Sequence, residues 1–208
     1  IVRVSVYDEA CAEAVKVLLS MPRGELAPVD FRVKTLEMTR RVPTPERVKQ
    51  CLELVRQPAD KVGHTEWTFA KEIVLLDSLL AARPMARVEV QAVQVGPAVF
   101  VANPAEFFCQ LGLDIKAGSP FQFTFPVELA NDCVGYVPTA EALGPRGGGY
   151  ETRLTSYSNL EPAAGKKIVD AGLELARQMK PGTLPEPPKA PPFKGQPWSY
   201  GNVPPELR

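Results

Sequence analysis

Two apolar strand patterns that meet at a turn constrain the fold of this chain most strongly. Residues 86–95 and 98–102 are rich in valine and alanine, and Gly96-Pro97 stands between them. Such a pair predicts a β-hairpin. A hairpin alone is only marginally stable in water, because it needs further strands or packed helices to bury its apolar side. We therefore expect the rest of the chain to supply a larger sheet and a layer that covers it.

Segments on both sides of this hairpin supply such elements. Apolar residues that recur every three or four positions predict helices, and alternating ones predict strands. The expected helices span 8–21, 45–56, 65–83, 105–116 and 161–179, and the further strands span 1–6, 31–37 and 121–129. Strands and helices alternate without a regular strand-helix-strand repeat. The sequence thus predicts an α/β fold of mixed sheets flanked by helices.

Composition narrows the functional classes. The 208 residues are enough for one domain with a sizeable core. Lys+Arg and Asp+Glu are both 24, and no run of basic residues stands out, so nothing indicates a nucleic-acid partner. No apolar run approaches the ~20 residues that cross a bilayer. Residues 181–208 hold nine of the 22 prolines and are expected to form an extended tail after a domain at 1–180.

Cysteine and histidine content excludes a conventional zinc knuckle. The four cysteines are widely spaced and form no Cys-x-x-Cys pair, and one disulfide among them is possible: they are Cys11, Cys51, Cys109 and Cys133. The single histidine, His64, stands directly before a predicted helix and is interpreted as a helix-start or surface residue.

Three segments can carry chemistry. Glu106 follows an apolar strand and Pro104, Tyr136 ends a turn-rich polar segment, and Tyr150 follows the glycine-rich loop at 144–149. Each also has a purely structural interpretation. Glu106 would face a helix dipole in a first turn, Tyr136 would be a core aromatic with its hydroxyl bonded to backbone, and Tyr150 would be incidental to a flexible loop.

In this order the three segments resemble the neutral (non-lysosomal) ceramidase family. The resemblance is carried by Pro104-x-Glu106-Phe107, by Leu129-Ala130-Asn131-x-x-x-Gly135-Tyr136-Val137-Pro138-Thr139-x-Glu141, and by Tyr150-Glu151. The segment from Asn131 to Thr139 is the specific one. The resemblance covers residues 86–180 well and residues 1–85 only in general pattern, and it implies the C-terminal portion of that family's catalytic domain.

The resemblance implies a zinc-dependent amidase that hydrolyses an N-acyl bond in ceramide or a related N-acylated amphiphile. Glu106 and Tyr136 would be zinc ligands, and Tyr150 would stabilise charge on the substrate oxygen. Zinc accepts carboxylate oxygens and favours deprotonation of a phenol. A bound zinc ion lowers the pKa of its water toward about 7 and polarises a carbonyl. A phenol aimed at the developing oxyanion adds preorganised stabilisation.

The chain departs from the family pattern at several positions. Ala105 replaces the usual glycine, and Cys133 stands where the family has the first tyrosine of its motif. The basic stretch that often follows the glutamate is here Cys109-Gln110-Leu111-Gly112-Leu113-Asp114-Ile115-Lys116. This stretch contains no arginine, so it lacks the arginine side chains that could contact a lipid head group there.

The implied zinc site also lacks two histidine ligands. Two protein ligands do not make a catalytic zinc site, so the missing histidines are expected on a preceding portion of the same protein, present as a separate chain or segment. The start at Ile1, without Met and in a strand-like pattern, agrees with that expectation. Family analogy favours secretion or a periplasmic location over the cytoplasm. It also leaves room for association with a membrane surface and for a homo-oligomer of the assembled unit.

Two other interpretations stay open. A non-catalytic or divergent relative would keep the fold while it binds a partner or ligand, or would hydrolyse a different amide. An unrelated α/β protein with an accidental motif would place Glu106 and Tyr136 far apart.

Overall fold

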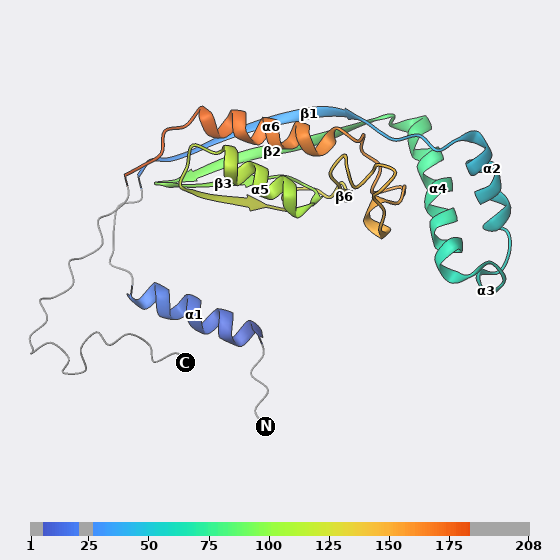
Figure 1. Ribbon diagram of the computed structural model, residues 1–208, viewed down its shortest axis with the longest axis horizontal. Coiled ribbons are helices and arrows are strands. Elements are labelled where there is room, and N and C mark those ends of the chain that lie inside the picture. The colour runs from blue at the N-terminus through green and yellow to red at the C-terminus, as the bar shows by residue number, and fades with distance from the viewer. Residues whose placement is uncertain (1–5, 21–26, 184–208) are drawn as a thin grey trace, which may run out of the picture.

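The computed structural model describes residues 6–20 and 27–183 of the chain (Figure 1). The strand predicted at 1–6 falls outside these residues except for Val6, and the predicted tail falls outside them from residue 184 onward. Sheets flanked by helices form the body of the protein, so the predicted α/β class is confirmed.

A four-stranded mixed sheet with the order β1-β2-β3-β5 forms the centre of the fold. Strands β1 (Val29–Thr39) and β2 (Met85–Val95) pair antiparallel along their whole lengths. The predicted hairpin is confirmed, because β2 turns at Gly96-Pro97 into antiparallel β3 (Ala98–Ala102). Strand β5 (Phe123–Val127) joins the other edge of β3 in parallel.

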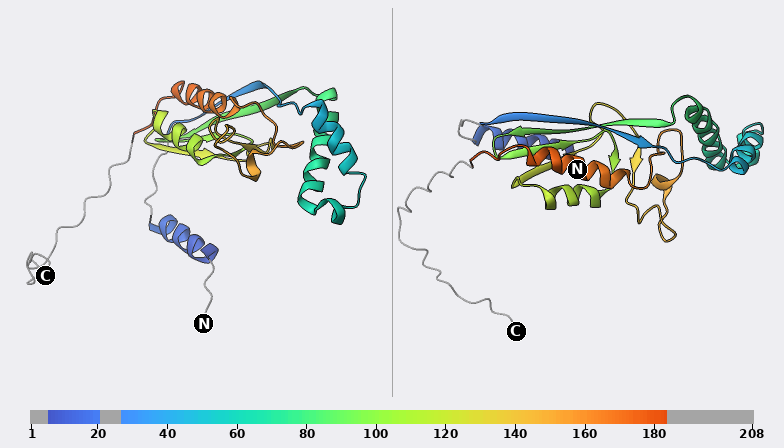
Figure 2. Two further views of the ribbon diagram at one scale, coloured as in Figure 1. Left: turned by 45° about the vertical axis from the view of Figure 1, so that its right-hand side comes forward. Right: turned by 90° about the horizontal axis from the view of Figure 1, so that it is seen from above.

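Two helices cover one face of this sheet. Figure 2 (right) shows α5 (Cys109–Gly118) and α6 (Ala164–Arg177) on the same side of the strands. Apolar side chains from this side of β2 and β3 meet those of the two helices in one core, which includes Val88, Val90, Val99, Val101, Leu111, Ile115, Ile168 and Leu175. Burying such aliphatic side chains contributes roughly 1.5–3 kcal/mol each. This layer packs against Val99 and Val101 of β3, which leads directly into the candidate site.

A helical unit is inserted between β1 and β2. It contains α2 (Pro45–Leu54), the short α3 (Ala59–Val62), which the sequence did not predict, and α4 (His64–Ala82). The Thr44 side chain caps α2 by accepting a hydrogen bond from the Arg47 backbone N–H. The unit has its own small core around Cys51, Ala70 and Ile73.

Helix α1 (Val6–Ser20) matches the first predicted helix and lies apart from the sheet in Figure 1 and in the left view of Figure 2. Its side chains from Cys11 to Leu19 are exposed. No described helix is both long and apolar enough to span a membrane.

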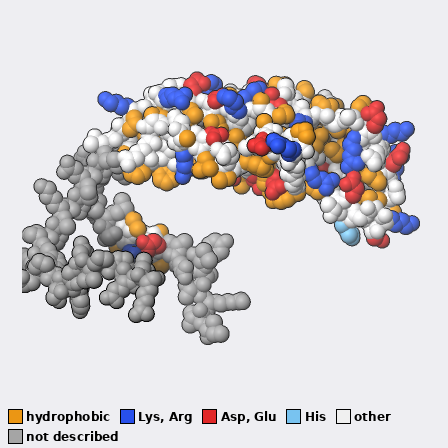
Figure 3. Space-filling view, viewed as in Figure 1, with side chains coloured by type: hydrophobic (Ala, Val, Ile, Leu, Met, Phe, Trp, Pro, Cys, Tyr) orange, Lys and Arg blue, Asp and Glu red, His pale blue; other side chains and the backbone are white. Residues whose placement is uncertain are grey.

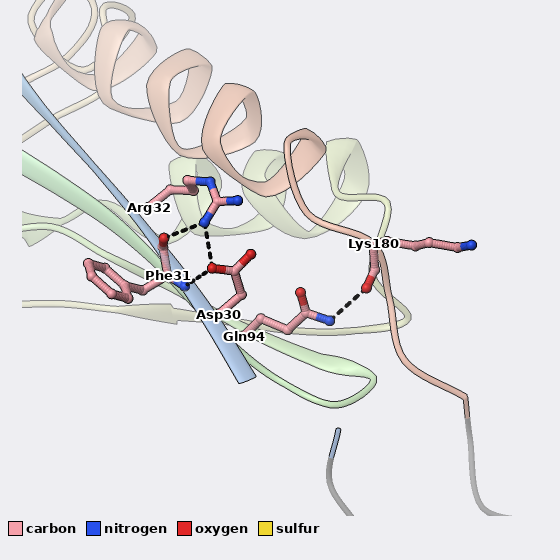
Figure 4. A network of polar contacts seen from close by, with 5 residues as sticks. All are labelled: Asp30, Phe31, Arg32, Gln94 and Lys180. Atoms are coloured by element: carbon pink, nitrogen blue, oxygen red, sulfur yellow. Dashed lines mark hydrogen bonds and ion pairs between the residues drawn. The ribbon is translucent and has the colours of Figure 1, made fainter. Parts of the chain in front are cut away.

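The segment that follows α6 is hydrogen-bonded to the β2–β3 turn. The buried Gln94 amide donates hydrogen bonds to the carbonyls of Gly96 (2.8 Å) and Lys180 (2.7 Å). Figure 4 shows the contact with Lys180. The Gly182 N–H donates to the Gly96 carbonyl at 3.0 Å. The first residues after 180 therefore pack on the sheet.

Candidate functional site

The site begins where β3 ends, at a second, two-stranded sheet. Strand β4 (Glu106–Phe107) pairs in parallel with β6 (Tyr136–Val137), so that Glu106 is the register partner of Tyr136. The helix predicted from residue 105 begins at Cys109 instead. Glu106 is therefore a strand residue, and its interpretation as a helix-dipole partner in a first turn is wrong.

A buried asparagine shapes the turn that precedes Glu106. The Asn103 side chain is fully buried, and its Oδ1 accepts a hydrogen bond from the Ala105 N–H at 3.0 Å. Its Nδ2 donates to the Val127 carbonyl at 3.4 Å. An asparagine that bonds backbone two residues on closes a tight turn. Asn103 thereby sets the direction in which the chain enters β4.

Gly135 and Ser158 position Tyr136. Gly135 has a positive φ of 69°, and a Cβ there would lie 2.5 Å from Ser158 Oγ and 2.6 Å from the Tyr157 carbonyl oxygen. Only glycine combines this backbone conformation with so close an approach. The Tyr136 N–H donates to Ser158 Oγ at 2.9 Å, and the Ser158 N–H donates to Thr155 Oγ1 at 2.8 Å.

Tyr150 meets Tyr136 from a separate loop. It begins the 3-10 helix η1 (Tyr150–Thr152), and its hydroxyl lies 3.3 Å from the Tyr136 hydroxyl. The two rings pack edge to face with centroids 5.5 Å apart. The Tyr150 side chain remains 63% exposed. Its structural interpretation as incidental to a loop does not account for this specific contact.

Hydrogen bonds organise the glycine-rich loop before Tyr150. The Ala142 N–H donates to Thr139 Oγ1 at 3.2 Å, and the Gly148 N–H donates to the Ala142 carbonyl at 3.1 Å. The loop therefore folds back on Thr139, within the motif that carries the resemblance, and delivers Tyr150 next to Tyr136.

The electrostatics of this cluster keep Tyr136 protonated. Hydrogen bonding to Tyr150, and then to Glu106, raises the pKa of Tyr136 well above its ordinary value. The Tyr136 hydroxyl thus bonds the Tyr150 hydroxyl, and not backbone as its structural interpretation supposed. An accidental motif in an unrelated protein would place Glu106 far from Tyr136. The two residues are instead register partners in neighbouring strands.

Arginine side chains anchor the loop that follows Tyr150. Arg41, two residues after β1, donates to the carbonyls of Thr152 (3.1 Å) and Ser158 (2.9 Å), and burial lowers the pKa of its guanidinium. Arg153 forms an ion pair with Glu66 of α4 at 3.1 Å. Both ends of the segment between Tyr150 and Ser158 are thus fixed to other elements.

The oxygen donors of this cluster fit part of a zinc site. One carboxylate and a neighbouring phenol suit Zn²⁺, and a cation between them would reverse the rise in the pKa of Tyr136. Among the described residues, no group of three or more His, Cys, Asp and Glu side chains could hold a metal ion. His64 begins α4 at the end that joins α3, and α4 is about 28 Å long, so His64 is at the far end of α4 from β2.

The structure therefore brings together Glu106, Tyr136 and Tyr150 but leaves out His64. Cys133 lines a separate cleft together with Arg40, Arg83 and Tyr157. All four cysteines lie within the described residues and are free thiols, so the disulfide that the sequence left open is absent.

Sequence reasoning missed three residues that build the site: Asn103, Ser158 and Arg41. Asn103-Pro104 could have been recognised as a turn signal. Ser158 and Arg41 act through contacts with residues far along the chain, for which the sequence holds no local signal.

Two solved ceramidase structures are similar to this mixed α/β chain. The neutral ceramidase from Pseudomonas aeruginosa matches at 14% identity and a TM-score of 0.48, over 83% of this chain and 32% of that one. A ceramidase complexed with C2 matches at 18% identity and a TM-score of 0.37, over 49% of this chain and 16% of that one. The chain thus spans less than a third of either. Neither a family model nor a curated protein matches the sequence.

Proposed function

We propose that this chain supplies the carboxylate and tyrosine part of a zinc-dependent amidase site that hydrolyses the N-acyl bond of a ceramide-like amphiphile. The chain would be the C-terminal portion of a neutral-ceramidase-like catalytic domain. The observation that carries the proposal is the convergence of Glu106, Tyr136 and Tyr150. These residues lie on the three segments of the sequence that resemble motifs of that family.

Glu106 and Tyr136 would hold the metal. They are register partners on β4 and β6, so backbone pairing fixes the relative positions of their side chains. Zinc at this position would activate a water molecule and polarise the amide carbonyl. Two histidines from a preceding portion of the protein would complete the ligand set, because two protein ligands alone do not form a catalytic zinc site.

Tyr150 would donate a hydrogen bond to the substrate oxygen. Its exposed side chain is accessible to a substrate from outside this chain, and its hydroxyl lies against Tyr136. The ordered glycine-rich loop holds this phenol in place before substrate arrives. A preorganised donor stabilises an oxyanion without reorganisation during the reaction.

Metal analysis of the complete protein tests the proposal. The chain together with its preceding portion should contain stoichiometric zinc, and Glu106→Ala should lower the zinc content strongly. Glu128→Ala is the matched control, because it removes an exposed carboxylate just after β5. The proposal fails if the wild-type protein contains no zinc, or if Glu106→Ala retains it.

The substitution of tyrosine by Cys133 favours a second candidate. A divergent member of the fold would bind a partner or ligand without hydrolysis, or would hydrolyse a different amide. Release of fatty acid from a ceramide by the zinc-loaded protein would exclude the non-catalytic form. Zinc binding without any amide hydrolysis would favour it.

A further inference from the structure

The sheet has a second face that the helices do not cover. Cross-strand pairing places Phe31, Val93, Phe100 and Phe125 in one row across all four strands. Val29 and Phe123 belong to the adjacent row. We call these six residues the open apolar face. Phe31 is 66% exposed, Phe125 44% and Phe100 37%, although the Phe100 and Phe125 rings stack with centroids 5.1 Å apart.

The open apolar face lies opposite the helices. Figure 4 shows Phe31 and Arg32 on opposite sides of β1, with Arg32 on the side of α6. The helix-covered side is mixed in charge (Figure 3) and carries ion pairs such as Lys34–Glu174 and Lys166–Asp170. The three phenylalanines of the long row have no such polar neighbours in their row.

The sequence of β3 indicates that this face is buried in the working protein. β3 reads Ala-Val-Phe-Val-Ala, which is apolar at every position and not at every second one. Such runs are typical of strands covered on both faces. A strand with one face in water would instead alternate apolar and polar residues.

The open apolar face also has a polar boundary. Farther along the same side of β1 and β2, the paired residues are Thr35 with Glu89 and Glu37 with Arg87. Glu37 and Arg87 form an exposed ion pair at 3.4 Å. An apolar centre beside a polar rim is the usual anatomy of a protein–protein interface.

We infer that the open apolar face is the docking surface for the preceding portion of the protein, which would cover it with an apolar layer of its own. This inference rests on the proposed function, because the two missing histidines require that portion to reach Glu106. Phe100 and Glu106 are only six residues apart in one segment, at most about 20 Å. One polypeptide layer can therefore cover the face and also reach the metal site.

Photo-crosslinking in the complete protein tests the inference. p-Benzoylphenylalanine would replace Phe31 or Phe125, and the crosslinked peptides would be identified by mass spectrometry. Leu113 of α5 is the matched control, since it is an apolar side chain 51% exposed on the helix side of the molecule. Crosslinks from positions 31 and 125 should reach the preceding portion, and those from position 113 should not.

Other occupants would give different products. Crosslinks to residues 6–20, to residues 184–208 or to a second copy of the chain would overturn the inference, and so would an absence of crosslinks. Zinc content measured on the same samples separates the two proposals. Zinc that depends on Glu106 together with crosslinks elsewhere refutes the docking surface alone. Crosslinks to the preceding portion in a zinc-free protein refute the zinc site alone.

Discussion

At the scale of single residues, the two tyrosines of the cluster have different surroundings. Tyr136 is half-buried, its backbone N–H donates to Ser158, and its hydroxyl lies 3.3 Å from the Tyr150 hydroxyl. Tyr150 is mostly exposed and contacts the cluster through its ring and hydroxyl. Substitutions at the two positions should therefore have separable effects on metal binding and on turnover.

Tyr150→Phe should impair turnover without loss of metal. Removal of one oxyanion donor lowers kcat by roughly 10²–10³-fold in well-studied hydrolases. We expect a fall of that order in ceramide hydrolysis by the complete protein, with unchanged KM and zinc content. Tyr157→Phe, at an exposed tyrosine seven residues along, should leave kcat unchanged. A loss of zinc together with kcat would contradict the assignment, because it would make Tyr150 a ligand.

Tyr136 should make the metal-free protein sensitive to high pH. Its folded pKa lies above the ordinary value of 10.0, mainly because of its bond to Tyr150. Above pH 10 the unfolded state therefore binds fewer protons than the folded state, and stability falls as pH rises. Below pH 10 this contribution is fully present. The free energy of unfolding in urea should fall more steeply above pH 10 for wild type than for Tyr136→Phe. Parallel profiles would argue against this phenol as the cause.

At the scale of elements, the sequence predicted the long strands and helices better than the short ones. The patterns of β1, β2 and α6 extend over ten or more residues, so periodicity identified them. β4 and β6 have two residues each, too few for any periodicity. Turns at Asn103 and Gly135 lead into these two strands. The motif resemblance identified Glu106 and Tyr136, but their pairing is a tertiary effect.

Gly135→Ala should disrupt this pairing. The positive φ costs a non-glycine residue about 1–3 kcal/mol, and the new methyl group would also collide with Ser158 Oγ and the Tyr157 carbonyl. Gly63→Ala is a matched control, because Gly63 also has a positive φ but has nothing within 4 Å of an added Cβ. Urea denaturation should show a larger loss of stability for Gly135→Ala, and only that variant should lose zinc. Equal losses would mean that the contacts do not matter.

At the scale of the whole molecule, an ion pair and a hydrogen bond connect the helical unit of α2, α3 and α4 to the loop after Tyr150. Glu66 of α4 binds Arg47 of α2 at 2.6 Å and Arg153 of the loop after Tyr150 at 3.1 Å. The Ser156 hydroxyl in the same loop donates to Glu72 of α4 at 2.5 Å. Although this unit lies at the end of the molecule away from α5 and α6 (Figure 1), it steadies the segment that carries Tyr150.

Glu66→Gln should weaken this connection in a pH-dependent manner. Hydrogen bonds from Arg47, and then from Arg153, hold the pKa of Glu66 below its ordinary value. Its contribution is therefore present above the unfolded pKa, about 4.3, and is lost as pH falls through the folded pKa. Because these side chains are partly exposed, we expect a loss of about 1 kcal/mol or less at pH 7. Thermal melts at pH 7 and pH 3 check this, with Glu53→Gln as the control. A difference that persists at pH 3 would contradict the ionic explanation.

The parallel pairing of Glu106 with Tyr136 also bears on how the protein can change over evolution. Helix α5 and strand β5 lie between these two residues in the chain, and the Val127 carbonyl at the end of β5 bonds Asn103, which shapes the turn before Glu106. We therefore expect insertions between α5 and β5 to leave the site intact. A single residue inserted between Gly135 and Tyr136 would rotate the tyrosine to the opposite side of β6. The chemistry is thus encoded in strand register and not in distance along the chain, so relatives can differ widely in length and still share one site.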